Sequence, residues 1–417
     1  MVTHRAAQDR GMRLFREYPT ATLIALPYAL LILPQAVVFG NPDVAYICIT
    51  LGIALIPALV VEVLSRRRSR VPLAGTFARR DVKILATAGA IVTSIGAISV
   101  VLRALAGVGS VFAQVGRGSS SSLLMTALSS LTPLMTVGIA LIGFAYIVGA
   151  CSRVTCLIWV AIALSCQAIA SYLLAITAPF FGFAIAVVLI LLYLGVIGIR
   201  HCVMAGIAIL VLWPTIYALR NEARVAGGVA VSSRMGAFDR LRYDLQITRG
   251  ADLGHGIDIA TPGPLEIIRY GLVPRFLDPG RPSLSTGVAL NVYLGGTSES
   301  AYTFLPVATA YVLEGPAVVA LLYGAWAVFV RLLMKCGNYV TWTRISLLAL
   351  LIDGPLGWFA TYPDATIGFV QSVVSLGLVG LLVGCLRLSA RTRESYARDG
   401  PMHRRWFLGT RTTLTSR

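Results

Sequence analysis

The chain has 417 residues, of which 57% are hydrophobic and 13% charged, and its formal net charge is +17. Soluble proteins carry about 25% charged residues, so this composition excludes an ordinary soluble globular protein. The basic balance fits either the positive-inside bias of a membrane protein or a polyanionic partner. The positions of the charges along the chain decide between these two explanations.

Ten apolar segments are read as transmembrane helices, because one crossing of a bilayer needs about 20 residues. In chain order they are 20–39, 43–64, 84–102, 131–150, 154–174, 178–198, 202–219, 312–333, 345–361 and 366–386. Segment 105–130 is also apolar, but glycines and a serine run interrupt it, so we expect a loop or a surface helix there. The sequence predicts an all-α protein, a polytopic transmembrane helical bundle of about ten spans with one large extracytoplasmic loop.

Four regions follow from this pattern. They are N-terminal membrane helices (1–218, about seven spans), a large arginine-rich loop outside the cytoplasm (219–302), C-terminal membrane helices (303–388, about three spans) and a basic cytoplasmic tail (389–417). An even number of spans places both termini on one side. The short segment 65–83 is dense in arginine, whereas 40–42, 175–177 and 362–365 carry no basic residue. By the positive-inside rule, both termini are expected in the cytoplasm.

The loop 219–302 carries most of the charge that lies between the spans. It holds nine arginines, eight acidic residues and His255. This near balance predicts a folded loop with internal ion pairs, not a polybasic segment that binds anionic lipid. The guanidinium fork of arginine binds phosphate through two parallel hydrogen bonds. The loop therefore suits a phosphate or pyrophosphate head group, unless each arginine only pairs with a neighbouring carboxylate and stabilises the fold.

Other residues that often carry chemistry are scattered. The seven cysteines and four histidines match no metal-ligand or disulfide spacing, so we expect no metal and no cofactor. Asp353 lies inside a predicted span and is followed by Gly354 and Pro355. A carboxylate within a membrane is a functional candidate by default, and Asp353 is kept here as one of lower rank.

Three short segments resemble Wzy-type polysaccharide polymerases, the O-antigen and exopolysaccharide repeat-unit polymerases of bacteria. Leu272–Pro282, with the sequence LVPRFLDPGRP, resembles the loop signature of that family. Ser233–Leu241 resembles the amphipathic segment that precedes this signature, and Tyr311–Val319 resembles the Glu-Gly turn that follows it. The matched motifs cover about 90 residues. One departure is Arg281, where the family often has lysine.

The resemblance implies a multi-pass glycosyltransferase of the bacterial cytoplasmic membrane, with both termini cytoplasmic. Such enzymes join polyprenyl-pyrophosphate-linked oligosaccharides, as donor and acceptor, on the outer face of that membrane. They need neither metal nor nucleotide sugar. Besides the substrate and the lipid bilayer, a chain-length regulator and a flippase are candidate partners, and nucleic acid is not expected.

Without a metal, the protein itself must supply positive charge to the pyrophosphate leaving group. We expect this charge from six loop arginines: Arg234, Arg240, Arg242, Arg269, Arg275 and Arg281. Glu314, Arg275 and Arg281 are the predicted catalytic residues, with Glu299 and His255 as other possible bases.

Three other functions stay open at this point. An O-antigen ligase shares the chemistry but is expected to have a loop histidine near the start of the following helix, and His255 is far from Glu314 in the sequence. A flippase or other transporter should bury charged residues within its spans, where Asp353 is nearly alone. A structural subunit of a glycan export complex leaves the arginine-rich loop without a role.

Overall fold

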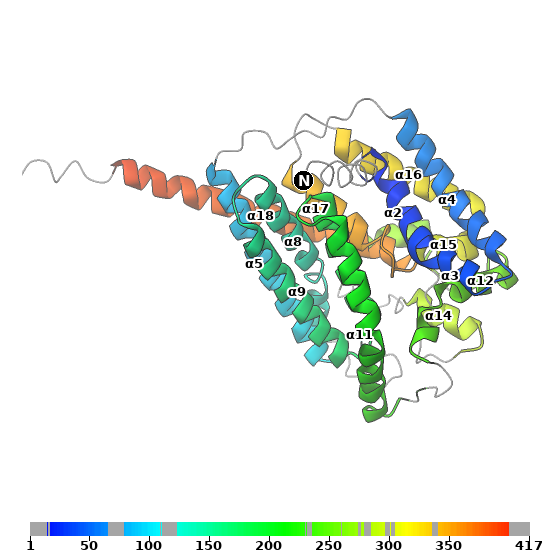
Figure 1. Ribbon diagram of the computed structural model, residues 1–417. Coiled ribbons are helices and arrows are strands. Elements are labelled where there is room, and N and C mark those ends of the chain that lie inside the picture. The colour runs from blue at the N-terminus through cyan, green and yellow to red at the C-terminus, as the bar shows by residue number, and fades with distance from the viewer. Residues whose placement is uncertain are drawn as a thin grey trace, which may run out of the picture.

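The computed structural model describes residues 15, 17–65, 79–108, 110, 123–229, 231, 236–259, 261–273, 277–278, 285–296, 301, 305–335 and 341–399. This part of the chain is helical and contains no strand. Figure 1 shows the long helices gathered into one bundle, with short helices at one end of it. The fold class expected from the sequence, an all-α protein, is confirmed.

Eight helices are long and apolar enough to cross a membrane. They are Pro19–Val38 (α2, η1 and α3), Val44–Leu64 (α4), Lys83–Leu105 (in α5, Arg79–Leu105), Ala127–Ile147 (from α7, Leu123–Ser129, through α8, Leu134–Ile147), Arg153–Leu173 (α9), Ile199–Ala226 (α11), Pro316–Met334 (in α16, Pro316–Lys335) and Asp364–Ser389 (in α18, Asp364–Asp399). Each overlaps one predicted span. The protein is therefore a multi-pass membrane protein by the length and composition of its helices.

The other two predicted spans correspond to shorter helices. Segment 178–198 forms α10 over Ala178–Tyr193, with 16 residues, and segment 345–361 forms α17 over Trp342–Asp353, with 12 residues. At about 1.5 Å per residue, α17 is only some 18 Å long. It ends where Gly354 and Pro355 follow Asp353, and a residue before proline disfavours the helical conformation. By length and composition alone, the described helices therefore support eight spans.

The predicted span 312–333 includes parts of two helices. Segment 312–333 is divided at Gly315, whose φ of +83° ends α15 (Leu305–Glu314) and lets α16 start at Pro316. Proline is favoured in the first turn of a helix, where its missing N–H costs nothing. The Glu-Gly turn read from the sequence is thus a break between two helices.

The region between α11 and α15 contains only short helices in its described part. They are η2 (Phe238–Leu241), α12 (Tyr243–Leu253), α13 (Pro264–Leu272) and α14 (Thr286–Tyr293). α12 packs against α3, α4 and α15 at one end of the bundle (Figure 1). The contact is close, because a Cβ added at Gly250 would lie 2.5 Å from Tyr46 Oη. Short helices of the loop are therefore fitted onto the long ones.

Among the described helices, α5 and α8 pack together over the most extensive contact. A side chain at Gly138 of α8 would collide with Thr93 of α5, and one at Gly96 of α5 would collide with the backbone of Met135. Glycines of this kind let membrane helices approach closely, since lipid tails leave packing as the main attraction between them. This contact holds the start of α8 next to α5.

A buried carboxylate anchors the opposite end of the bundle. Glu62 in α4 is fully buried and accepts hydrogen bonds from the backbone N–H groups of Thr20 and Ala21, at 2.8 and 3.2 Å. It thereby satisfies donors in the first turn of α2 that have no partner within the helix. Arg331 of α16 donates to the Glu62 carbonyl at 3.1 Å. Three helices are joined through one residue.

Candidate functional site

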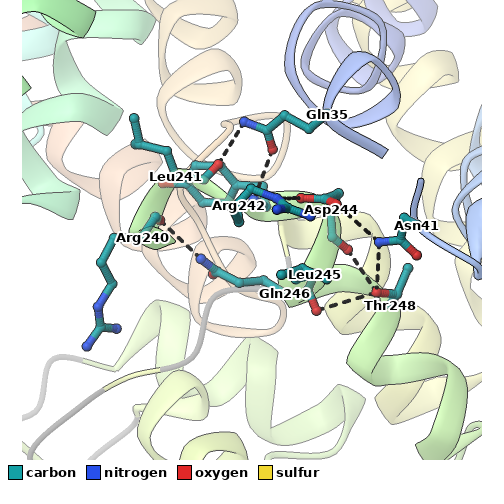
Figure 2. A network of polar contacts seen from close by, with 10 residues as sticks. Gln35, Asn41, Arg240, Leu241, Arg242, Asp244, Leu245, Gln246 and Thr248 are labelled. Carbon is teal, nitrogen blue, oxygen red and sulfur yellow. Dashed lines mark hydrogen bonds and ion pairs between the residues drawn. The ribbon is translucent and has the colours of Figure 1, made fainter. Parts of the chain in front are cut away.

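The loop arginine with the clearest role is Arg242. Its Nε donates to Asp244 Oδ1 at 2.8 Å and its Nη2 to Asp244 Oδ2 at 2.9 Å, so the pair is bidentate (Figure 2). The guanidinium also lies 3.8 Å from the centre of the Phe39 ring. The Asp244 side chain is fully buried, whereas 21% of the Arg242 side chain is exposed. Arg242 is thus engaged in the fold.

The same network joins the loop to the first membrane helices. Asn41 Nδ2 donates to Asp244 Oδ2 at 3.1 Å. The Gln35 amide bridges the loop backbone, donating to the Leu241 carbonyl at 2.8 Å and accepting from the Tyr243 N–H at 3.1 Å. Figure 2 shows these bonds on either side of the Arg242–Asp244 pair. The geometry therefore shows that Arg242 pairs with a carboxylate within the fold.

Arg240 and Arg269, the two other arginines predicted to bind phosphate that the structure describes, do not take part in this network through their side chains. Arg269 forms an ion pair with Asp278 at 2.9 Å, and 59% of its side chain is exposed. Arg234, Arg275, Arg281 and Glu299 lie outside the described residues. In Figure 2 the side chain of Arg240 points away from the carboxylate network.

Arg240 belongs to an arginine cluster, which we define as Arg220, Arg224 and Arg240. Arg224 and Arg240 are close enough to Arg220 for their charges to act on it. The guanidinium of Arg220 lies 4.6 Å from the centre of the Tyr217 ring, and the Tyr217 hydroxyl is within hydrogen-bonding reach of Arg240. Arg220 of α11 and Arg240 of η2 therefore both contact Tyr217, and Arg224 lies near Arg220.

The position of η2 in this cluster is held by Trp213. Its indole Nε1 donates to the Ala237 carbonyl at 2.6 Å, and its ring is buried. Ala237 directly precedes η2, so this bond places Arg240 beside the last turns of α11. Arg224 is held as well, because its Nε donates to the Ala175 carbonyl at 3.1 Å.

The electrostatics of the cluster favour an anion. Arg220 Nη2 donates to Oδ1 of the neutral Asn221 side chain at 2.7 Å. The Nε of Arg240 is buried without a hydrogen bond to any described residue. Neither forms an ion pair with a described carboxylate. The C-terminal end of α11 carries partial negative charge, which offsets only part of the repulsion. Guanidinium groups such as those of Arg220 and Arg240, which lie close together without a described carboxylate partner, readily bind phosphate.

Glu314 and His255 both lie near the end of α15, although 59 positions separate them in the sequence. Glu314 accepts a hydrogen bond from the Tyr362 hydroxyl. Burial, followed by the charge of Glu314, raises the pKa of Tyr362 to about 12. A Cβ added at Gly315 would lie 3.5 Å from His255 Nδ1, and the imidazole meets the Tyr311 ring edge-on. Two predicted bases therefore lie near the same helix end.

A cavity of about 240 Å³ lies among α8, α9, α10 and the connection from α17 to α18. The Asp353 carboxylate is in its lining and accepts a hydrogen bond from Thr136 Oγ1 at 2.6 Å. Gln167, which is buried, lines the same space. Trp358 and Phe359 complete one wall. Asp353, the candidate of lower rank in the sequence, thus lines a cavity large enough for a ligand.

Aromatic rings connect this cavity to the arginine cluster. Phe359, in the cavity wall, lies 6.3 Å from Phe181, and Phe181 lies 5.3 Å from Trp213. Trp213 in turn lies 6.0 Å from Tyr217, the tyrosine of the cluster. Ala175, which Arg224 binds, is three residues before Ala178 in the cavity lining. The cluster and the cavity therefore form two parts of one region.

Sequence reasoning missed several residues of this region. Arg220 and Arg224 were counted among the loop arginines but not chosen, although Tyr217, Arg220 and Arg224 share one helical face at spacings of three and four. Thr136 and Gln167 gave no signal, because single polar residues in apolar segments are common. Among the described residues, no group of three His, Cys, Asp or Glu side chains is placed to hold a metal ion.

No family model matches this chain, and no curated protein or solved structure matches it either. The resemblance to the polymerases therefore rests on the three sequence motifs alone. The function has to be argued from the chemistry of the site.

Proposed function

We propose that this protein is a membrane glycosyltransferase that joins polyprenyl-pyrophosphate-linked oligosaccharides, in the manner of a polysaccharide polymerase. The observation that carries the proposal is the arginine cluster at the end of a helix of membrane-spanning length. A lipid-linked pyrophosphate has its anionic group where the apolar chain leaves the bilayer. In this proposal Arg220, Arg224 and Arg240 lie at the level of that group.

The chemistry of the transfer explains why arginines are suited to it. When the sugar–pyrophosphate bond breaks, negative charge develops on the leaving oxygen. Guanidinium groups that are already clustered stabilise this charge without having to be assembled during the reaction. Arginine stays protonated in all such settings. In this proposal Arg220 and Arg240 bind the pyrophosphate, while Arg242 and Asp244 hold the loop in position.

The topology predicted from the sequence is part of the same proposal. In it the protein spans the bacterial cytoplasmic membrane ten times, with α10 and α17 each contributing to a crossing. The segment 219–302 then lies outside, together with the ends of α9 and α11 and the start of α10. The hydrogen bond from Arg224 to Ala175 supports this arrangement, because it joins the end of α11 to the end of α9.

The experiment is a comparison of glycan size in a strain that lacks this protein, complemented with wild type or with Arg220→Ala. We expect wild type to restore long chains and Arg220→Ala to leave single repeat units, with extension slowed about 10²–10³-fold, the usual cost of losing one donor to a developing oxyanion. Lipid-linked and surface glycans are separated by size on gels.

The matched control is Arg200→Ala, which removes an exposed arginine from the other end of the same helix, α11. It is expected to restore long chains as wild type does. Long chains made at the wild-type rate by Arg220→Ala would rule out a role for the cluster. Repeats trapped on the cytoplasmic face of the deletion strain would indicate a flippase instead.

A second candidate, an O-antigen ligase, is favoured by the position of His255. The distance in sequence between His255 and Glu314 counted against a ligase, but the imidazole lies against Gly315 at the start of α16. In a ligase, the deletion strain would accumulate long chains that remain on the lipid carrier. That product distribution separates the two enzymes directly.

A further inference from the structure

We propose that the cavity around Asp353 binds one sugar ring of the acceptor glycan and that Asp353 accepts the proton of the attacking hydroxyl. This inference rests on the proposed function, because it assigns the acceptor side of the same transfer. The arginine cluster provides for the donor pyrophosphate, and the attacking hydroxyl needs a separate group to take up its proton.

The size of the cavity fits such a ligand. Its volume of about 240 Å³ is far above the roughly 10–15 Å³ that one water molecule needs. It is also below the roughly 300–1,000 Å³ of pockets for drug-sized ligands. The space therefore suits a molecule of monosaccharide size better than either an isolated ion or a lipid chain.

The lining has the chemistry of a sugar site. A sugar ring offers hydroxyl groups at its edge and C–H groups on its faces. Asp353 accepts hydrogen bonds, and the Gln167 amide both donates and accepts. Trp358 and Phe359 supply flat apolar surfaces in the wall. The Trp358 indole N–H is buried without a hydrogen bond to any described residue, so an acceptor nearby would satisfy it.

The carboxylate is oriented for proton transfer. Thr136 donates to Asp353 Oδ2, which leaves Oδ1 for an incoming hydroxyl. In the transfer, the acceptor oxygen forms a bond to the anomeric carbon of the donor. The bond from that carbon to the pyrophosphate oxygen breaks, and its electron pair stays on the pyrophosphate at the arginine cluster. The hydroxyl proton moves to Asp353.

The connection from α17 to α18 links the cavity to the arginine-rich loop. The segment between Asp353 and Asp364 lines the cavity with Gly357, Trp358, Phe359 and Ala360. Phe359 further contacts the Tyr243 ring at 5.5 Å, and Tyr243 follows Arg242 in the loop. A glycan lying across this segment would reach from the cavity to the arginine cluster.

The test uses the lipid-linked single repeat that accumulates in the deletion strain, extracted and added to the full-length protein in lipid nanodiscs. We measure binding of this repeat and its conversion to longer chains separately. For Asp353→Asn we expect binding within about twofold of wild type and conversion slowed about 10²–10⁴-fold, the usual effect of losing a general base. Thr136→Val, which only frees the carboxylate, should slow conversion less.

A second variant tests the cavity itself. Gly182 lines it, and a Cβ there would lie 3.7 Å from Phe359, so Gly182→Leu fills the space without a backbone clash. We expect a higher KM for the acceptor repeat. The control is Gly206→Leu in α11, where a Cβ meets nothing within 4 Å, and it should behave as wild type does.

The outcomes separate the two proposals. If wild type extends chains but Asp353→Asn extends them equally fast, Asp353 is not the base and the polymerase proposal stands. If Asp353→Asn is slow while Gly182→Leu keeps the wild-type KM, no sugar occupies the cavity and the inference is wrong. If wild type itself extends no chains, the proposed function fails, and this inference fails with it.

Discussion

At the scale of single residues, the loop arginines fall into two groups. Arg242 and Arg269 are paired with carboxylates, and their charge serves the fold. Arg220 and Arg240 lack such a pair among the described residues and lie close to each other. Like charges are held together only where the fold opposes their repulsion, and here Trp213 fixes the turn that carries Arg240. The distinction between the groups depends on the partners of each arginine, since all four come from the segment 219–302.

The Arg242–Asp244 pair makes a prediction about pH. Burial raises the pKa of Asp244, but hydrogen bonds from Arg242 and Asn41 outweigh it and hold the pKa below the ordinary value of 3.8. The ionised form therefore stabilises the folded state fully above about pH 4, and this contribution is lost as the pH falls below that value. Asp244→Asn should lower the Tm at pH 7, because it breaks the buried pair.

The measurement is the Tm of wild type and Asp244→Asn in detergent at pH 7 and at pH 3. The difference in Tm between them should shrink at pH 3, because this pH lies below the ordinary pKa of 3.8, in the range where the contribution of the ionised pair is being lost. An equal difference at both pH values would mean that the variant destabilises by altered packing, independent of charge. Arg242→Lys serves as the control for geometry, since lysine keeps the charge but not the bidentate pair.

At the scale of elements, glycines decide how closely the helices pack. Gly138 of α8 lies against the backbone of α5, and the start of α8 carries Thr136, which binds Asp353. The contact between α5 and α8 therefore also positions one wall of the cavity. The packing of two long helices thus influences the candidate site.

Gly138→Leu is expected to destabilise the protein by about 1–3 kcal/mol, the usual cost of overpacking a filled core. The added side chain would meet backbone atoms of Thr93, which have no room to move within α5. Thermal unfolding followed by tryptophan fluorescence measures the loss. Gly377→Leu in α18 is the control, because a Cβ there meets nothing within 4 Å; an equal loss in both variants would contradict this account of the packing.

At the scale of the whole molecule, one end of the bundle gathers the loop helices. α12 packs against α3, α4 and α15 (Figure 1), while Glu62 and Arg331 join helices at the other end. The proposed topology assigns the first end to the outside and the second to the cytoplasm. A basic end on the cytoplasmic side agrees with the arginine-rich segment 65–83 and the basic tail.

Reporter fusions test this topology. An alkaline phosphatase domain, which is active only outside the cytoplasm, is joined after Gly263 in one fusion and after Ser389 in another. We expect activity from the first fusion and none from the second. Activity from both, or from the second alone, would show that the assignment of sides is wrong. Western blots of the two fusions control for expression.

Several features of this protein were readable from its sequence because they depend on local properties of the chain. Apolar runs of about 20 residues mark the eight long helices. The breaks at Gly315 and at Gly354–Pro355 stop helices through backbone geometry, although the spans 312–333 and 345–361 were predicted to run across them. The helices at 178–198 and 345–361 are shorter than the spans predicted there. A run of apolar side chains shows what can be buried, but the glycines and prolines within it decide where the helix ends.

The candidate site required the tertiary structure. Thr136, Gln167 and Asp353 come from three separate segments, and nothing in their local sequence marks them as neighbours. The arginine cluster combines α11 with a turn some 15–20 residues later. Arg242 differs from Arg240 in its neighbours, because Asp244 lies beside Arg242 and pairs with it. The sequence by itself determined a helical membrane protein with an arginine-rich loop, because hydropathy and charge act residue by residue. Which arginines are paired, and which carboxylate faces a cavity, was decided by long-range packing that brings distant segments together.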